Sequence, residues 1–106
     1  MKTKTKLTPR QQSKLAASLL DWHGGQSSAV YAVGSCMLSD FHHEKAYDPA
    51  NHRGHADSET ETGAVRRACF ELRGLRKYAR HPQAVTQRME TSCNRLADKL
   101  AEIYLS

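Results

Sequence analysis

The sequence predicts an all-α fold of four helices in a single domain over residues 1–106. Apolar residues recur every three or four positions in three stretches, which is the period of a helix with one buried face. A fourth stretch, residues 27–40, is apolar almost throughout, and no second strand-like run is present to pair with it in a sheet. A chain of 106 residues has room for one modest core, so we expect one domain, with residues 1–7 as a flexible basic N-terminus.

The first helix is expected over residues 9–23. Thr8 can cap this helix, and Pro9 fits its first turn. Gly24 can adopt the positive φ that commonly ends a helix. The apolar stripe of this helix consists of Leu15, Leu19 and Trp22.

The second helix is expected over residues 27–40, with Ser27 or Ser28 as its cap. Few polar side chains interrupt the apolar ones, so this helix is expected to lie at the centre of the fold. Gly34 has no side chain and marks a point of close approach between helices.

A long surface loop is expected over residues 41–57, because the apolar period disappears there and Pro49 and Gly54 are present. Loops of this length are uncommon in compact domains and are often functional or mobile.

The third and fourth helices are expected over residues 58–80 and 83–104. Ser58 and Glu61 have the spacing of a capping box at the start of the third helix. Pro82 ends that helix and can open the next. The connection is short, so these helices are expected to form a C-terminal antiparallel hairpin against which the first two pack.

The segment between the first two helices contains a glycine pair, and two interpretations remain open. The main-chain amides of Gly25, Gln26 and Ser27 at a helix start could bind an anion. Gly24, Gly25 and Gln26 also resemble the motif of peptidyl-tRNA-hydrolysing release factors over three residues, although the residues that follow depart from that family. The segment contains neither the Walker pattern GxxxxGK[ST] nor the Rossmann pattern GxGxxG, which are the known phosphate-binding loops. We therefore favour a simple corner between helices and assign no family.

Four histidines lie in the expected loop, at His42, His43, His52 and His55. Histidine, cysteine and carboxylate side chains are the ligands that zinc prefers, but the spacing matches no familiar zinc site. We favour a solvated loop and expect no cofactor, with zinc binding or pH sensing as the alternatives.

Basic residues cluster on one side of the third helix, next to its apolar stripe. At 100° per residue, one narrow arc holds Arg66, Arg73, Lys77 and Arg80, with Phe70 at its edge. Arginine interleaved with an aromatic ring is typical of a surface that binds an acidic or phosphate-bearing partner. The alternative is that these side chains only cover the edge of the core.

The distribution of charge agrees with a binding surface. The net charge is +5, made up of +4 before residue 40, −4 over residues 40–61, and +5 from residue 62 onward. A basic excess of this kind attracts polyanions or acidic protein surfaces.

Several classes of protein are disfavoured by what the sequence lacks. No nucleophile elbow, zinc-protease motif or paired-carboxylate arrangement is present, so we expect no enzyme. No signal peptide or membrane-length apolar run is present either, and we expect a cytoplasmic protein. The three cysteines are an odd number in apolar surroundings and are expected to be buried thiols.

These observations favour a small helical binding protein that docks on a macromolecular partner, with protein preferred over nucleic acid. Regulators and phage- or plasmid-encoded inhibitors of host defence, such as anti-CRISPR proteins, are solitary chains of this size. Nucleic-acid binding through the basic ends is one alternative, and a metal-binding protein or small enzyme using the histidine loop is another. Apolar stripes this wide could also pack against a second copy of the chain, so a homodimer is a further possibility.

Overall fold

The structure, a computed structural model, describes residues 6–21, 28–54, 59–79 and 81–105, and every regular element in these ranges is helical. This confirms the all-α prediction. None of the described helices is both long and apolar enough to cross a bilayer. The elements are α1 (Pro9–Leu20), α2 (Ser28–His42), the 3-10 helix η1 (Pro49–His52), α3 (Gly63–Arg73), α4 (Leu75–Tyr78), the 3-10 helix η3 (Pro82–Ala84) and α5 (Gln87–Tyr104).

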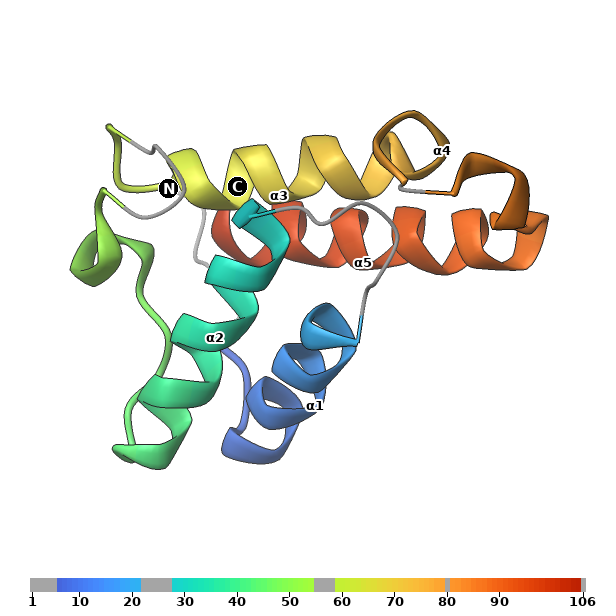
Figure 1. Ribbon diagram of the computed structural model, residues 1–106. Helices are drawn as coiled ribbons and strands as arrows, with labels where there is room; N and C mark the ends of the chain where they lie inside the picture. The colour runs from blue at the N-terminus through green and yellow to red at the C-terminus, as the bar shows by residue number, and fades with distance from the viewer. Residues whose placement is uncertain (1–5, 22–27, 55–58, 80, 106) are drawn as a thin grey trace.

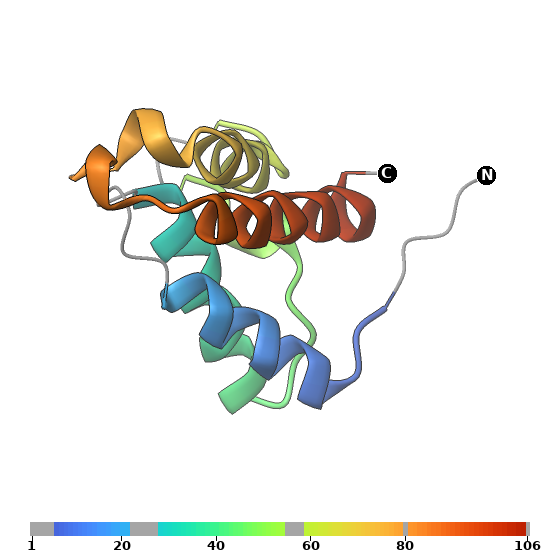
Figure 2. The same cartoon turned by 90° about the vertical axis from the view of Figure 1, so that its right-hand side faces the viewer.

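The helices form two layers (Figures 1 and 2). One layer contains α3 and α5, which pack against each other, and the other contains α1 and α2. The N-terminal end of α2 reaches the first layer and contacts α3, so α2 touches both its own partner α1 and the opposite layer.

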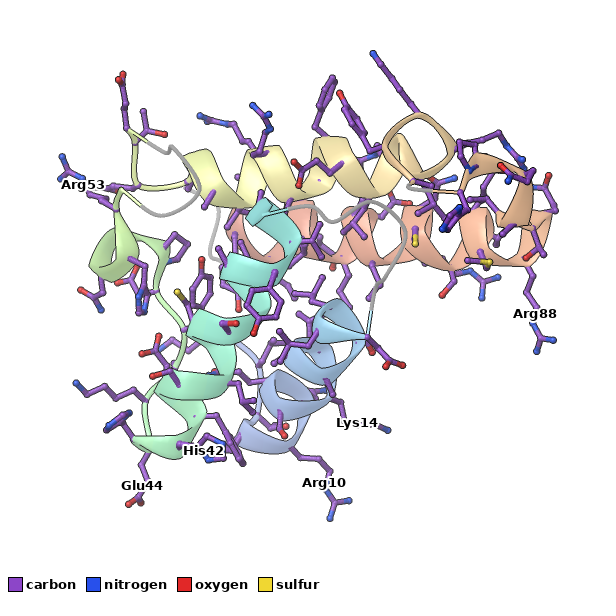
Figure 3. The ribbon with its side chains drawn as sticks, in the orientation of Figure 1. Arg10, Lys14, His42, Glu44, Arg53 and Arg88 are labelled. Carbon is purple, nitrogen blue, oxygen red and sulfur yellow. The ribbon has the colours of Figure 1, made fainter. Side chains whose placement is uncertain are left out.

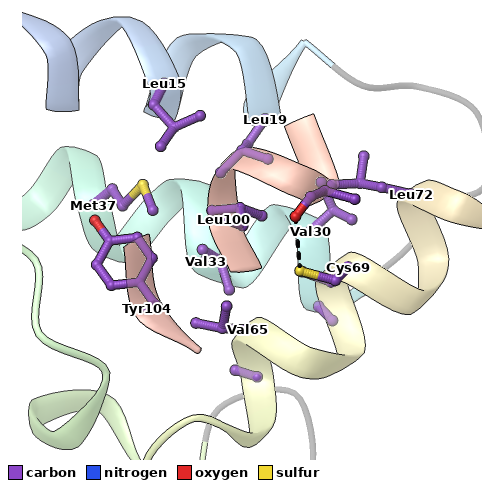
Figure 4. Close-up of a cluster of buried hydrophobic side chains, with 14 of the residues drawn as sticks. Leu15, Leu19, Val30, Val33, Met37, Val65, Cys69, Leu72, Leu100 and Tyr104 are labelled. Atoms are coloured by element: carbon purple, nitrogen blue, oxygen red, sulfur yellow. Dashed lines mark hydrogen bonds between the residues drawn. The ribbon is translucent and has the colours of Figure 1, made fainter. Parts of the chain in front are cut away.

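One cluster of apolar side chains fills the space between the layers (Figure 4). Val30, Val33 and Met37 of α2 are fully buried in this cluster, as the central position expected for this helix requires. Cys36, Cys69 and Cys93 are buried free thiols. Helices α1, α2, α3 and α5 are therefore stabilised mainly by the apolar side chains that they bury in this cluster.

Helix α1 begins as expected but ends earlier. The hydroxyl of Thr8 accepts a hydrogen bond from the main-chain N–H of Gln11, and the Gln11 side chain accepts one in return from Thr8. The helix ends at Leu20 rather than at residue 23, with Asp21 as its C-cap. The expected stop at Gly24 and the expected last residue of the apolar stripe, Trp22, lie outside the described residues.

Gly34 of α2 is the point of close approach between helices that the sequence indicates. A Cβ atom at this position would lie 3.1 Å from the Cβ of Leu19 and 3.1 Å from the Cγ of Leu20. Glycine therefore lets α1 and α2 pack at this short distance.

The third helix is shorter than expected and is broken. It begins at Gly63, five residues after the expected start, because Glu61 and Thr62 adopt a turn. Gly74 then leaves the helical conformation, with φ −102° and ψ 34°, and separates α3 from α4. Ser58, the other half of the expected capping box, lies outside the described residues.

The last helix also begins later than expected. Pro82 opens the short helix η3 instead of α5. The start of α5 is set by Thr86, whose hydroxyl accepts a hydrogen bond from the N–H of Met89 at 3.1 Å. The connection between α3 and α5 thus contains α4 and η3, where the sequence predicts a short turn.

The segment expected to be a solvated loop contains short helical pieces and two buried side chains. Helix α2 extends into it as far as His42, and η1 follows at Pro49–His52. The side chain of Tyr47 is buried, as is Pro49. The segment is therefore exposed along most of its described length, as expected for a surface loop, but the buried ring of Tyr47 holds it against the core.

Candidate functional site

The outer side of α3 and α4 carries aromatic and basic side chains together. Phe70 is 60% exposed there; among the described residues, Tyr31 and Met89 are the other large hydrophobic side chains that are exposed. We call this surface the aromatic-basic face and define it by Arg66, Arg67, Phe70, Arg73, Lys77 and Tyr78.

The helical period places these residues on one side. Val65, Ala68 and Leu72 turn inward and are fully buried. Arg66, Arg67 and Phe70, which fall between them, are exposed. Glu71 is the only acidic residue from position 63 to 78, and its side chain is only 9% exposed. Basic residues therefore outnumber acidic ones on α3 and α4, although the exposed carboxylate of Asp98 on α5 lies next to Arg73.

Two of the cations have acidic partners. Nη2 of Arg73 donates a hydrogen bond to Oδ1 of Asp98 on α5 at 2.8 Å. Nε of Arg67 lies 3.4 Å from Oε2 of Glu71, one turn further along α3. Both arginines are largely exposed, so these pairs orient the guanidinium groups more than they stabilise the fold.

The aromatic rings form a pair at the end of the face. The ring centroids of Phe70 and Tyr78 lie 5.9 Å apart with an interplanar angle of 55°. Nζ of Lys77 lies 5.5 Å from the centroid of the Tyr78 ring, within the range of a cation–π contact.

Arg76 does not belong to this face. Its guanidinium donates to Glu90 at 2.9 Å and to the main-chain oxygen of Pro82 at 3.4 Å. The hydrogen bond with Glu90 raises the pKa of Arg76. Arg76 therefore ties α4 to η3 and to the start of α5.

Of the five residues predicted for a binding surface, the structure places four. Arg66, Phe70, Arg73 and Lys77 share the aromatic-basic face, whereas Arg80 lies outside the described residues. The predicted anion site at Gly25, Gln26 and Ser27 also lies outside them.

The loop histidines are not gathered at one point. His42 and His43 are exposed, and Nδ1 of His43 lies 2.8 Å from the main-chain oxygen of Ser39. His52 instead contacts Asp40 and Tyr47, and His55 lies outside the described residues. In the part of the chain that the structure describes, no three His, Cys, Asp or Glu side chains are arranged to hold a metal ion.

The contact of His52 belongs to a second cluster, which joins the loop to α2 and α5. Nε2 of His52 lies 2.8 Å from Oδ2 of Asp40, and its ring stacks on Tyr47 at 5.6 Å between centroids. Tyr47 in turn meets the ring of Tyr104 edge-on at 5.1 Å. Cys36 lies one helical turn before Asp40 on α2.

Burial sets the chemistry of this second cluster. Burial, with smaller contributions from neighbours that include Cys36, raises the pKa of Tyr47. Burial and the charge of Asp40 raise the pKa of Tyr104 to about 12 and also raise the pKa of the Cys36 thiol. A thiol with a raised pKa is a poor nucleophile, so this cluster has the properties of a structural contact.

A shallow groove runs between the segment before α1 and the second half of α5. Two basic and two acidic residues line it, so it carries no net charge that would select a ligand. The lining residues are Leu7, Gln11, Arg95, Asp98, Lys99, Glu102 and Ile103.

Two members of the aromatic-basic face are not predicted from the sequence. Arg67 falls outside the narrow arc of an unbroken helix. Tyr78 also falls outside this arc and joins the face only where the helix breaks. Gly74 was the one available sign of that break, because glycine is unfavourable inside a helix.

The fold and the face define a small all-helical protein with a basic aromatic surface. Comparisons with protein-family models, curated proteins and solved structures found no match to this chain.

Proposed function

We propose that this chain is a small binding protein that docks on another protein through the aromatic-basic face. The observation that carries the proposal is Phe70, a large apolar ring that is 60% exposed among the basic side chains of α3 and α4. Aromatic and arginine side chains are the residues that most often contribute the binding energy of protein interfaces. Such a protein acts by occupying its partner's surface, as a regulator or inhibitor in the cytoplasm does.

The experiment compares capture of partners by matched variants. One variant reverses three charges of the face, at Arg66, Arg73 and Lys77. The control variant reverses three exposed cations elsewhere, at Arg10 and Lys14 of α1 and Arg88 of α5, whose side chains project away from the layers (Figure 3). Both variants have the same net charge, so a difference between them reports the position of the charges.

We expect cross-linking in lysate of the source cells to capture the same partner with the wild-type chain and with the control variant. Capture should be lost with the face variant and with Phe70→Ala, while the circular dichroism spectrum stays helical. Equal capture by the face variant would refute the proposal.

Nucleic-acid binding remains the second candidate, because Lys77 and Arg66 could contact phosphates while Phe70 stacks on a base. Its signature is an affinity for single-stranded oligonucleotides that falls steeply with salt. If the wild-type chain shows this behaviour and the face variant does not, nucleic acid replaces protein as the partner.

A further inference from the structure

The break in the helix at Gly74 determines the shape of the aromatic-basic face. In an unbroken helix, Phe70 and Tyr78 would be eight residues apart, which is about 12 Å along the axis. Their ring centroids lie 5.9 Å apart, so the pair exists only because the chain turns between α3 and α4.

Gly74 also makes room for the second ring. A Cβ atom at Gly74 would lie 2.9 Å from Cε2 and 3.1 Å from Cδ2 of Tyr78. The shorter of these contacts would force the Tyr78 ring to move, so the ring occupies space that the absence of a Cβ atom at Gly74 leaves open. Gly74 is therefore a positioning residue for Tyr78.

The charges around this aromatic pair lie at its two ends. Arg66 is one helical turn before Phe70, and Lys77 is beside Tyr78. Between them, Arg73 is already neutralised by Asp98. Arg66 and Lys77 are eleven residues apart, at most about 16 Å along a helix. An extended peptide covers that distance in about five residues.

We propose that the face receives a short extended segment of the partner that has one large apolar or aromatic side chain between acidic residues. The apolar side chain rests on Phe70 and Tyr78, and the carboxylates meet Arg66 and Lys77. The apolar ring pair calls for the apolar side chain of the partner, and the two cations call for its acidic residues. The inference rests on the proposed function and specifies the partner's chemistry.

The test uses a synthetic peptide, Glu-Glu-Gly-Phe-Gly-Glu-Glu with blocked ends, titrated into the full chain and followed by amide NMR shifts. Two matched peptides each lack one feature: Ser replaces Phe in one, and Gln replaces every Glu in the other. Single-stranded oligothymidylate is the nucleic-acid probe.

We expect the complete peptide to shift resonances of α3 and α4 and to bind at least about tenfold more tightly than either matched peptide, because each feature contributes at about the level of an interface hot spot. Phe70→Ala and Lys77→Glu should each weaken binding of the complete peptide by about tenfold. Arg10→Glu, on the far side of the molecule, should have no effect.

The role of Gly74 is tested by a double-mutant cycle. Gly74→Ala and Tyr78→Ala should each lower the affinity for the complete peptide. The double variant should bind this peptide as tightly as Tyr78→Ala alone does, because Gly74 acts through the Tyr78 ring. Tyr78→Phe keeps the ring and should bind as the wild type does. Additive losses would contradict the positioning role.

Other outcomes separate this inference from the proposed function. If no peptide shifts α3 and α4 but the charge-reversed face still loses its captured partner, the inference is wrong and protein docking stands. If oligothymidylate binds the face more tightly than the complete peptide, both are wrong and the partner is nucleic acid.

Discussion

Gln12 and Tyr47 are joined by a buried hydrogen bond in which the main-chain N–H of Tyr47 donates to Oε1 of Gln12 at 3.1 Å. The same side-chain amide donates through Nε2 to the main-chain oxygens of Met37, at 3.0 Å, and Lys45, at 3.1 Å. Gln12 is only 3% exposed. One side chain of α1 thus satisfies three main-chain groups at the end of α2 and in the loop that follows.

Gln12→Ala should lower the free energy of unfolding by about 2–4 kcal/mol, because it removes three hydrogen bonds, two of them buried. Urea unfolding measures this change, and amide hydrogen exchange at Tyr47 should become faster. The neighbouring Gln11→Ala removes only an exposed capping bond and should cost about 1 kcal/mol or less. Equal losses at the two glutamines would contradict the role of Gln12.

Glu71→Met should leave the stability unchanged or raise it by about 1 kcal/mol. Oε1 of Glu71 is buried and has no hydrogen-bond partner, and a half-satisfied buried carboxylate costs more than an apolar side chain of similar size. Its partner Arg67 is 63% exposed and remains solvated in the variant. Urea unfolding is the measurement, and Glu61→Met at an exposed position should change stability by less than about 0.5 kcal/mol. A clear loss at Glu71 would show that its charge stabilises the fold.

His52→Ala should lower the free energy of unfolding by about 1–2 kcal/mol, because it removes both the contact with Asp40 and the stacking on Tyr47. Hydrogen exchange should accelerate over residues 45–53. His42→Ala, at an exposed position on the same segment, is the control and should leave both measurements unchanged. If the two variants behave alike, the second cluster does not hold the loop.

The stability should fall as the pH rises above about 10. The pKa of Tyr104 is raised to about 12 by burial, and that of Tyr47 is raised as well, whereas unfolded tyrosine loses its proton near pH 10. Between these values the unfolded state binds fewer protons than the folded state, so the free energy of unfolding decreases with pH. The contribution is complete below about pH 10 and is lost as the pH rises through about 12.

Each buried tyrosine should reduce the free energy of unfolding by up to about 1.4 kcal/mol per pH unit in this window. Urea unfolding at several alkaline pH values gives the slope, and Tyr104→Phe should flatten it. Tyr31→Phe is the control, because Tyr31 is 64% exposed. A slope that Tyr104→Phe leaves unchanged would assign the alkaline loss to other groups.

Local signals in the sequence were enough for much of the fold. Thr8 and Pro9 start α1 because a hydroxyl cap and a fixed φ act within one turn. The spacing of Val65, Ala68 and Leu72 indicated which side of α3 is buried, and thereby placed Phe70 outside. The predicted limits of α3 and α5 were wrong, because several nearby residues can cap or open a helix and the sequence does not show which of them does so. Thr86, rather than Pro82, begins α5.

Helical periodicity and charge are properties of neighbouring residues, so they were enough to predict the helical class, the central position of α2 and the cations beside Phe70. Three contacts could not be predicted in this way: the burial of Tyr47 in the core, the hydrogen bonds of Gln12 to the loop, and the pairing of Tyr78 with Phe70 across Gly74. Each of these contacts depends on the path of the main chain between elements. That path is set by packing among residues far apart in the sequence, which no local pattern encodes.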